Sequence, residues 1–341
     1  MRLILAAVLL LTSCAPSVPM GQGPVSPGAS PSTSGVASTG GGSSPSPSSA
    51  LNVLGKCRLP VNAGNPAKLG WLDVPGGTFT PDPASVGHIS PDSFIAAWDP
   101  AIASWVPTDP KSISPDGTRY VATNTSLKID IIDAKSGSTI AAIPPHYQSG
   151  PPRPPGLDYQ GVFVVLGFTP TAIFLVQAGK NPQPGLWKID ASSWALSQVT
   201  SKGPGLGWAL VDGSVVWGTR ASATGYDGID RLDTSTGVVQ EVRAPGQTDW
   251  GIAGLAGSGV LVVSDDPFLS AEVVNVDGSS HPVDIPPALS SAGLLTDTLQ
   301  DGPDILFATT VGLVAYDQNF GFQLLVSRSD LYEIRGRCVP A

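Results

Sequence analysis

Charged residues are scarce in this chain of 341 residues, and stretches with helical periodicity are missing beyond its first residues. Lys, Arg, Asp and Glu together make up 13% of the sequence, which is about half of the usual share in soluble domains. Glycine (40 residues) and proline (34 residues) are in excess. Because both residue types are unfavourable inside helices, the composition predicts an all-β, turn-rich protein.

Clusters of lysine or arginine are also missing, and the net charge is −9. A protein that binds DNA or RNA needs a basic surface to replace the counterions of the phosphates. We therefore expect no nucleic-acid partner.

The N-terminus has the pattern of a targeting segment. Met1-Arg2 is positively charged, Leu3–Leu11 is apolar, and Leu11-Thr12-Ser13-Cys14 follows at once. An apolar run this short does not span a bilayer. Leu-Thr-Ser-Cys resembles the lipobox of bacterial lipoproteins. The resemblance implies that residues 1–13 are a signal peptide and that a lipidated Cys14 anchors the mature chain to the membrane. The alternative is an ordinary signal peptide in which Cys14 has no special role.

Residues 14–50 predict a disordered tether. After Cys14 they consist almost wholly of Ser, Pro, Gly, Ala, Thr and Val and contain no charged residue. Such a segment buries too little apolar surface to offset its ordering entropy. We expect it to hold the folded domain, residues 51–341, away from the membrane, facing either a periplasm or a cell wall.

The folded part contains two cysteines, Cys57 near its start and Cys338 near its end. Outside the cytoplasm, a lone pair of this kind is most simply a disulfide. It would tie the two ends of one domain together. A metal site is the alternative, but neither cysteine has a histidine or a second cysteine at ligand spacing.

An apolar strand that ends in aspartate recurs along the chain. Each copy is followed by a short turn and another strand, and the aspartates are Asp99, Asp133, Asp190, Asp233, Asp277 and Asp317. Their spacings are 34, 57, 43, 44 and 40 residues. A repeat of forty-odd residues with about four strands is typical of propeller blades. The pattern predicts one β-propeller of six four-stranded blades, and the interval of 57 residues leaves room for a seventh.

Ring closure is expected at the chain ends, where Leu51–Leu59 or Tyr332–Cys338 would supply the last strand. The Ser114-Pro115-Asp116-Gly117 turn resembles the turn of TolB-like and WD-type propeller repeats. The resemblance covers the architecture of residues 51–341. It implies a fold and says nothing about an activity, because propellers host many functions. Seven tryptophans fall in or beside the predicted strands, where packing between blades is favoured over a carbohydrate-binding platform.

Motifs of catalysis are missing too. The three histidines, His88, His146 and His281, are scattered, and there is no Gly-x-Ser-x-Gly elbow or phosphate-binding loop. We expect no cofactor and no metal. Carboxylates outside the repeated turns are the remaining candidates for a site: Asp158, Asp249, Asp265, Asp266 and Asp297.

These observations predict a non-enzymatic binding or scaffold module at the cell envelope, with an envelope protein or glycan as its partner. The long loops Pro144–Gly156 and Gly179–Gly185 are the candidate contact surfaces. The alternatives are an extracytoplasmic carbohydrate-active or other hydrolytic enzyme and a domain with only a structural role in the envelope. The enzyme would need two carboxylates that converge at the mouth of the propeller channel.

Overall fold

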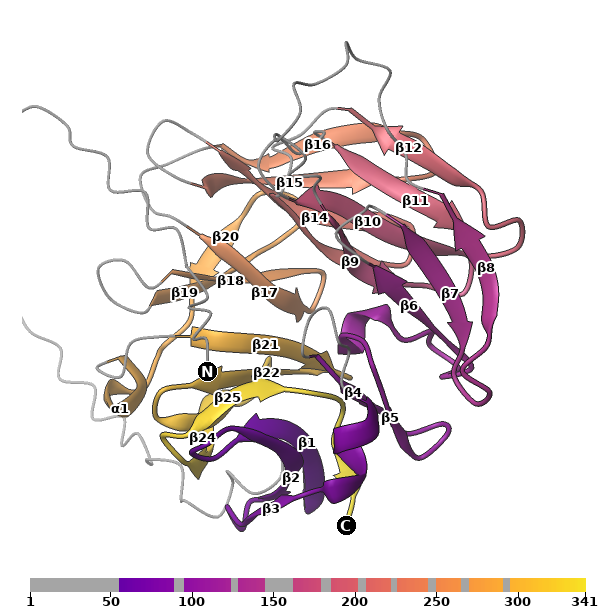
Figure 1. Cartoon of the computed structure of the whole chain (residues 1–341). Helices are drawn as coiled ribbons and strands as arrows, with labels where there is room; N and C mark the ends of the chain where they lie inside the picture. Colours follow the sequence, from indigo (N-terminus) through magenta and orange to yellow (C-terminus); the bar gives the residue numbers. More distant parts are fainter. Residues whose placement is uncertain are drawn as a thin grey trace, which may run out of the picture. The chain divides into compact units, whose positions relative to one another are not determined.

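A computed structural model of the chain describes residues 55–88, 95–123, 128–144, 162–178, 185–201, 207–221, 226–244, 250–264, 270–290 and 295–341. Residues 1–13, the tether 14–50 and Cys14 lie outside these ranges. So do both long loops, apart from their end residues Pro144 and Gly185. The described residues belong to one unit, Ser46–Ala341, which contains many strands and little helix (Figure 1).

The described part of the chain is a six-bladed β-propeller. In each of blades 3 to 6, four consecutive strands form one antiparallel sheet. Blade 3 consists of β9 (Val162–Phe168), β10 (Ala172–Ala178), β11 (Leu186–Asp190) and β12 (Leu196–Thr200). Blade 4 consists of β13 (Trp208–Asp212), β14 (Val215–Ala221), β15 (Tyr226–Asp233) and β16 (Val238–Arg243).

Blade 5 consists of β17 (Gly251–Ala256), β18 (Gly259–Ser264), β19 (Ser270–Val274) and β20 (Ser280–Pro282). A one-turn helix, α1 (Pro287–Ser290), precedes blade 6. Blade 6 consists of β21 (Leu295–Asp301), β22 (Asp304–Thr309), β23 (Gly312–Asp317) and β24 (Gly321–Ser327).

Blade 1 closes the ring with strands from both ends of the chain. Its strand order is β25 (Leu331–Ile334), β1 (Cys57–Ala63), β2 (Lys68–Val74) and β3 (Phe79–Pro81). The last strand, β26 (Val339–Pro340), also pairs with β1. The prediction that the ring closes at the chain ends is therefore confirmed, since both proposed segments take part in the closure.

Blade 2 and a small hairpin lie between blades 1 and 3 in sequence. Blade 2 contains β6 (Arg119–Thr123), β7 (Ile129–Asp133) and β8 (Thr139–Ile143), with an isolated bridge between Ile113 and Tyr120 in place of a fourth strand. The hairpin pairs β4 (Ala97–Asp99) with β5 (Ser104–Val106). Two short 3-10 helices flank it, η2 (Pro83–His88) and η3 (Pro110–Ser112).

Six blades are confirmed, but the repeat pattern assigned one of them to the wrong residues. The unit that ends in Asp99 is the two-stranded hairpin rather than a blade. Blade 1 contains an aspartate turn that the pattern missed: the Asp73 N–H donates to Thr78, and the Gly77 N–H donates to the Asp73 carbonyl. Asp73 escaped notice because its strand continues to Val74 before the turn.

The hydrophobic core is divided among the junctions between neighbouring blades. In β10, Ile173 and Leu175 belong to a cluster shared with blade 2, whereas Phe174 and Val176 belong to a cluster shared with blade 4. Side chains alternate between the two faces of a strand. A blade with neighbours on both sides therefore needs apolar residues at every position, which explains the unbroken apolar runs in the sequence.

The tryptophans pack inside the protein, as predicted. Trp71, Trp98 and Trp105 form one cluster with ring centroids 4.7 to 6.1 Å apart. The indole N–H groups of Trp71 and Trp105 both donate to the Asp82 carboxylate, at 3.0 and 2.9 Å. Trp187, Trp208, Trp217 and Trp250 are also buried.

The repeated aspartates act as turn residues, also as predicted. In all six turns the carboxylate accepts backbone N–H groups two or three residues further on, for example from Ala101 to Asp99 at 2.9 Å and from Ser136 to Asp133 at 2.7 Å. The hydrogen bonds close each turn locally, so this part of the repeat follows from the sequence alone.

Asp304, at the β21–β22 turn, gives a pH-dependent prediction. Burial, together with the nearby carboxylates of Asp317 and Asp301, raises the pKa of Asp304 to about 6. The folded state therefore disfavours the ionised form of Asp304. This group destabilises the fold as the pH rises from the pKa of Asp304 in the unfolded chain towards its folded pKa of about 6. We expect Asp304→Asn to raise the melting temperature at pH 7.5 and to have little effect at pH 4.

Thermal unfolding at the two pH values checks this prediction, with Asp277→Asn as the control. Hydrogen bonds from the Ser279 hydroxyl and N–H lower the pKa of Asp277, so its ionised form is favoured in the fold and its replacement should give no gain at pH 7.5. An equal gain for Asp304→Asn at both pH values would contradict the electrostatic explanation.

Candidate functional site

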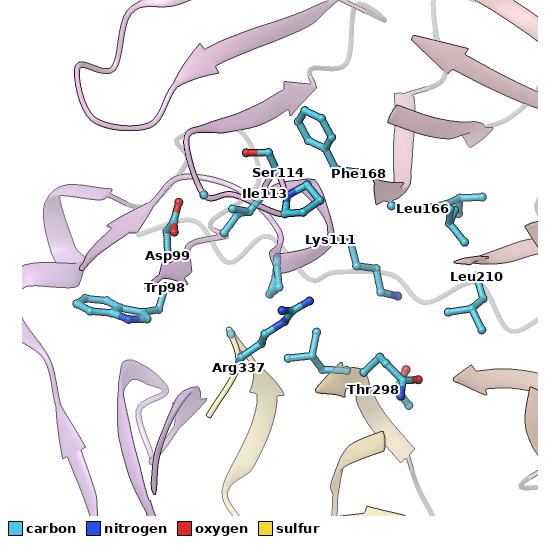
Figure 2. A pocket seen from close by; sticks show the side chains of 18 of the residues that line it. Trp98, Asp99, Lys111, Ile113, Ser114, Leu166, Phe168, Leu210, Thr298 and Arg337 are labelled. Atoms are coloured by element: carbon cyan, nitrogen blue, oxygen red, sulfur yellow. The ribbon is translucent and has the colours of Figure 1, made fainter. Parts of the chain in front are cut away.

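A cavity of about 300 Å³ lies where the inner strands of blades 3 to 6 meet the hairpin turn and the C-terminal segment. The inner strands contribute residues from β9, β13, β17 and β21, and the remaining wall comes from residues 98–101, 110–117 and 336–337. Figure 2 shows side chains from these separate segments around one hollow. The volume is at the lower end of the range for small-molecule sites.

Most of the wall is apolar. Leu166 and Phe168 come from blade 3, Leu210 and Val211 from blade 4, and Ile252 from blade 5. Such a lining favours a ligand with an apolar part, with a few polar groups left to fix its orientation.

Two cationic side chains, Lys111 and Arg337, extend into this apolar hollow (Figure 2). Lys111 is held by η3, where the Asp109 carboxylate caps the turn by accepting the Lys111 N–H at 2.9 Å. Arg337 precedes Cys338, whose N–H donates to the Asp301 carboxylate at 2.8 Å. Both cationic residues are exposed, so they can meet a solute that enters the cavity.

Two carboxylates, Asp99 and Asp116, also border the cavity, but each is committed to a turn. Burial raises the pKa of Asp99, and the nearby Asp116 carboxylate raises it further. Hydrogen bonds from the Ser114 hydroxyl, the Thr118 N–H and the Thr118 hydroxyl lower the pKa of Asp116. Asp99 has a relative exposure of 0%, so its carboxylate is not accessible to a bound molecule.

The Ser-Pro-Asp-Gly turn covers Asp99 and forms part of the cavity wall. Gly117 has φ of +65°, and a Cβ atom there would lie 2.3 Å from the Ala101 Cβ and 2.5 Å from the Asp99 Oδ1. Only glycine allows both this backbone conformation and this close approach. The motif that suggested a propeller therefore also shapes the cavity, which the sequence did not reveal.

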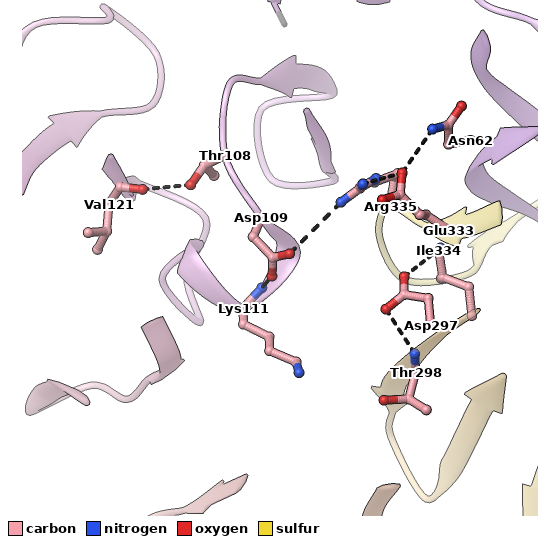
Figure 3. Close-up of polar contacts among 10 residues, drawn as sticks. All are labelled: Asn62, Thr108, Asp109, Lys111, Val121, Asp297, Thr298, Glu333, Ile334 and Arg335. Atoms are coloured by element: carbon pink, nitrogen blue, oxygen red, sulfur yellow. Dashed lines mark hydrogen bonds and ion pairs between the residues drawn. The ribbon is translucent and has the colours of Figure 1, made fainter. Parts of the chain in front are cut away.

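Arg335 connects the cavity region to the ring closure (Figure 3). Its side chain is 6% exposed and forms ion pairs with Glu333 and, at 3.9 Å, with Asp109. Glu333 in turn accepts a hydrogen bond of 2.8 Å from the Asn62 amide on β1. Asp109 caps the turn that holds Lys111, so one buried guanidinium links β1, β25 and η3.

Asp297 is the one sequence-predicted carboxylate candidate within the described residues, and it has a structural role. Its carboxylate accepts the N–H groups of Thr298 at 2.8 Å and Ile334 at 2.9 Å. Burial raises the pKa of Asp297. It therefore joins blade 6 to the closing strand β25 rather than forming a catalytic pair.

The other four carboxylate candidates, Asp158, Asp249, Asp265 and Asp266, lie outside the described residues, as does His146. His88 and His281 are exposed and far apart in sequence. Among the residues that the structure describes, no three His, Cys, Asp or Glu side chains gather in a way that could hold a metal ion. The same part of the chain contains no helix with the length and apolar character needed to cross a membrane.

Comparisons with known proteins reveal similarity at the level of structure only. No protein-family model matches the chain, and no curated protein is similar to it in sequence. Among solved structures, it resembles a streptogramin B lyase at 15% identity and a TM-score of 0.40, over 66% of this chain and 70% of the lyase. It resembles BamB from Moraxella catarrhalis at 14% identity and a TM-score of 0.34, over 65% of this chain and 74% of BamB.

A third similar structure is the computationally designed protein Ika8, at 11% identity and a TM-score of 0.40. The alignment covers 66% of this chain and 64% of the designed protein. At such low identity the similarity concerns the fold, and function has to be argued from the cavity itself.

Proposed function

We propose that this protein is a membrane-anchored, extracytoplasmic binding module whose ligand occupies the central cavity. The observation that carries the proposal is the cavity itself, a mostly apolar hollow into which two cationic side chains extend. Its walls come from the inner strands of four blades, so they are rigidly supported. Apolar walls with a few convergent polar groups are the usual features of a ligand site.

The enzymatic alternative lacks support at this cavity. Hydrolysis by paired carboxylates requires both groups to reach the substrate. Asp99 and Asp116 have pKa values shifted in opposite directions, which is the pattern of an acid–base pair. However, Asp99 is completely buried, and Asp116 accepts its hydrogen bonds from within its own turn. Burial and the neighbouring Asp116 carboxylate explain the raised pKa of Asp99, and the hydrogen bonds of its own turn explain the lowered pKa of Asp116.

A cavity-blocking variant tests the binding function. Thr298 lines the cavity from β21, and Thr298→Trp would fill part of it. The matched control is Thr139→Trp, at an exposed position on β8. The full-length protein, purified from its own membranes, would be examined by native mass spectrometry. We expect a bound species in the wild type and in the control that is lost in Thr298→Trp. Equal occupancy in both variants would contradict the proposal.

The lipid anchor is tested separately at Cys14. We expect Cys14→Ala to move nearly all of the protein from the membrane fraction to the soluble extracytoplasmic fraction, because the acyl chains supply the attachment. Mass spectrometry of the wild-type N-terminal peptide should find the lipid on Cys14. The control is Ser13→Ala, which keeps a small residue beside the cysteine. Membrane attachment that survives Cys14→Ala would overturn the anchoring proposal.

A further inference from the structure

The two cationic side chains of the cavity stand out in an acidic chain because neither has a carboxylate partner among the described residues. The chain carries a net charge of −9, and the cavity lining holds two cations, Lys111 and Arg337, and two carboxylates, Asp99 and Asp116. Lys111 and Arg337 extend into the hollow (Figure 2). A concave surface with apolar walls focuses the field of such groups. The carboxylates of the lining accept hydrogen bonds within their own turns, so the two cations are the charged groups of the lining that are not engaged in this way.

Neither cation is neutralised by a protein side chain within the described residues. Other arginines in this part of the protein have carboxylate partners: Arg220 pairs with Asp230 and Glu241, Arg243 with Glu272, and Arg328 with Asp330. Lys111 and Arg337 have no ion pair among the described residues, although Asp99 and Asp116 border the same cavity. Asp99 is covered by its turn, and Asp116 accepts hydrogen bonds from Ser114 and Thr118. The cationic groups thus remain available to a ligand.

We propose that the cavity binds a small organic anion, in which a carboxylate or phosphate group is attached to an apolar body. The anionic group would lie between Lys111 and Arg337, and the apolar body would contact the wall formed by Leu166, Leu210 and Ile252. A guanidinium matches the geometry of both carboxylate and phosphate. A volume of about 300 Å³ limits the ligand to a small molecule or to a short part of a larger one.

This inference rests on the proposed binding function and specifies its ligand. Four probes with the same eight-carbon chain separate the contribution of the ligand's charge to binding from that of its apolar body. Octanoate and octyl phosphate are anions, octanol is neutral, and octylamine is a cation. Isothermal titration calorimetry on the full-length protein measures each affinity in 50 mM salt. We expect both anions to bind at least tenfold more tightly than octanol, and octylamine to bind least. Inorganic phosphate is expected to bind more weakly than octyl phosphate, because it has no apolar part.

Charge-neutral variants test the two cations directly. Because each cation would donate hydrogen bonds to the anionic group, we expect Lys111→Met and Arg337→Met each to weaken octanoate binding about tenfold, and the double variant to abolish measurable binding. The matched control is the double variant Lys68→Met/Arg231→Met. It removes the same charge from blades 1 and 4 outside the cavity, and should bind as the wild type does. Circular dichroism and melting temperature check that every variant is folded.

The outcomes separate the two proposals. If the anions bind no better than octanol, or bind equally well to the Lys111→Met/Arg337→Met variant, the anionic specificity is wrong. If octylamine binds best, the sign of the site is wrong. In either case a bound species that is lost in Thr298→Trp would still support the binding function, whereas its presence in that variant would overturn the function itself.

Discussion

Replacing Cys57 and Cys338 by serine is expected to lower the free energy of unfolding by about 5 kcal/mol. The two Cα atoms lie 5.7 Å apart, within the range for a disulfide, and the residues are separated by 281 positions in the sequence. A bond that closes so long a loop removes much conformational entropy from the unfolded chain. We expect the melting temperature to fall by on the order of 10 °C or more.

Chemical denaturation of the wild type and of Cys57→Ser/Cys338→Ser measures this difference. Each single variant should lose as much stability as the double variant, because either one breaks the bond. Treatment of the wild type with a reducing agent should reproduce the loss, and the same treatment should leave the double variant unchanged. A difference below about 1 kcal/mol, a small fraction of the loop-closure value, would mean that the ring is held closed by strand pairing alone.

Arg335→Met is expected to lower the free energy of unfolding by about 2 kcal/mol, because it removes a buried, hydrogen-bonded guanidinium and the cation that opposes the raised pKa of Asp297. The guanidinium of Arg335 is the cation next to Glu333, Asp109 and the buried carboxylate of Asp297. Burial already raises the pKa of Asp297, and Arg335 opposes that increase.

The loss should depend on pH. A carboxyl group whose folded pKa is raised destabilises the fold as the pH increases through that range. Without Arg335 the pKa of Asp297 should rise further, so the stability deficit of Arg335→Met should be larger at pH 7 than at pH 4. Urea unfolding at both pH values measures the stability deficit.

The matched control is Arg58→Met. Arg58 pairs with Asp73 at 3.7 Å, but these side chains are 44% and 49% exposed. Such a pair is worth less than about 1 kcal/mol. Equal losses for the two variants would refute the importance of the buried network.

Features that depend on neighbouring residues in the chain could be predicted from the sequence. The aspartate turns are one example, because a carboxylate reaches backbone N–H groups only two or three residues away. The apolar runs are another, because a strand between two blades must be apolar on both faces. These two patterns were sufficient for the propeller fold. The count of six blades is confirmed although one counted unit, which ends in Asp99, is a hairpin. Closure at the chain ends was predicted from the position of the terminal segments and of Cys57 and Cys338.

The assignment of residues to blades was less predictable. Asp99 and Asp73 both belong to turns, but the sequence around Asp99 resembles the repeat more closely. Whether a turn belongs to a full blade depends on how many strands pair beside it, and the pairing partner of β1 comes from the far end of the chain. No local pattern contains that information.

The cavity was decided by the tertiary structure alone. Lys111 belongs to a short 3-10 helix near the hairpin, and Arg337 lies between β25 and β26. In the sequence the two residues are 226 positions apart, and nothing local connects them. They meet because the C-terminal segment crosses the ring closure, where the Arg335 N–H donates to the Pro60 carbonyl and the Trp98 N–H donates to the Arg335 carbonyl. The sequence thus determined the repeated unit through short-range hydrogen bonds and side-chain alternation, whereas closure of the ring brought Lys111 and Arg337 to one cavity.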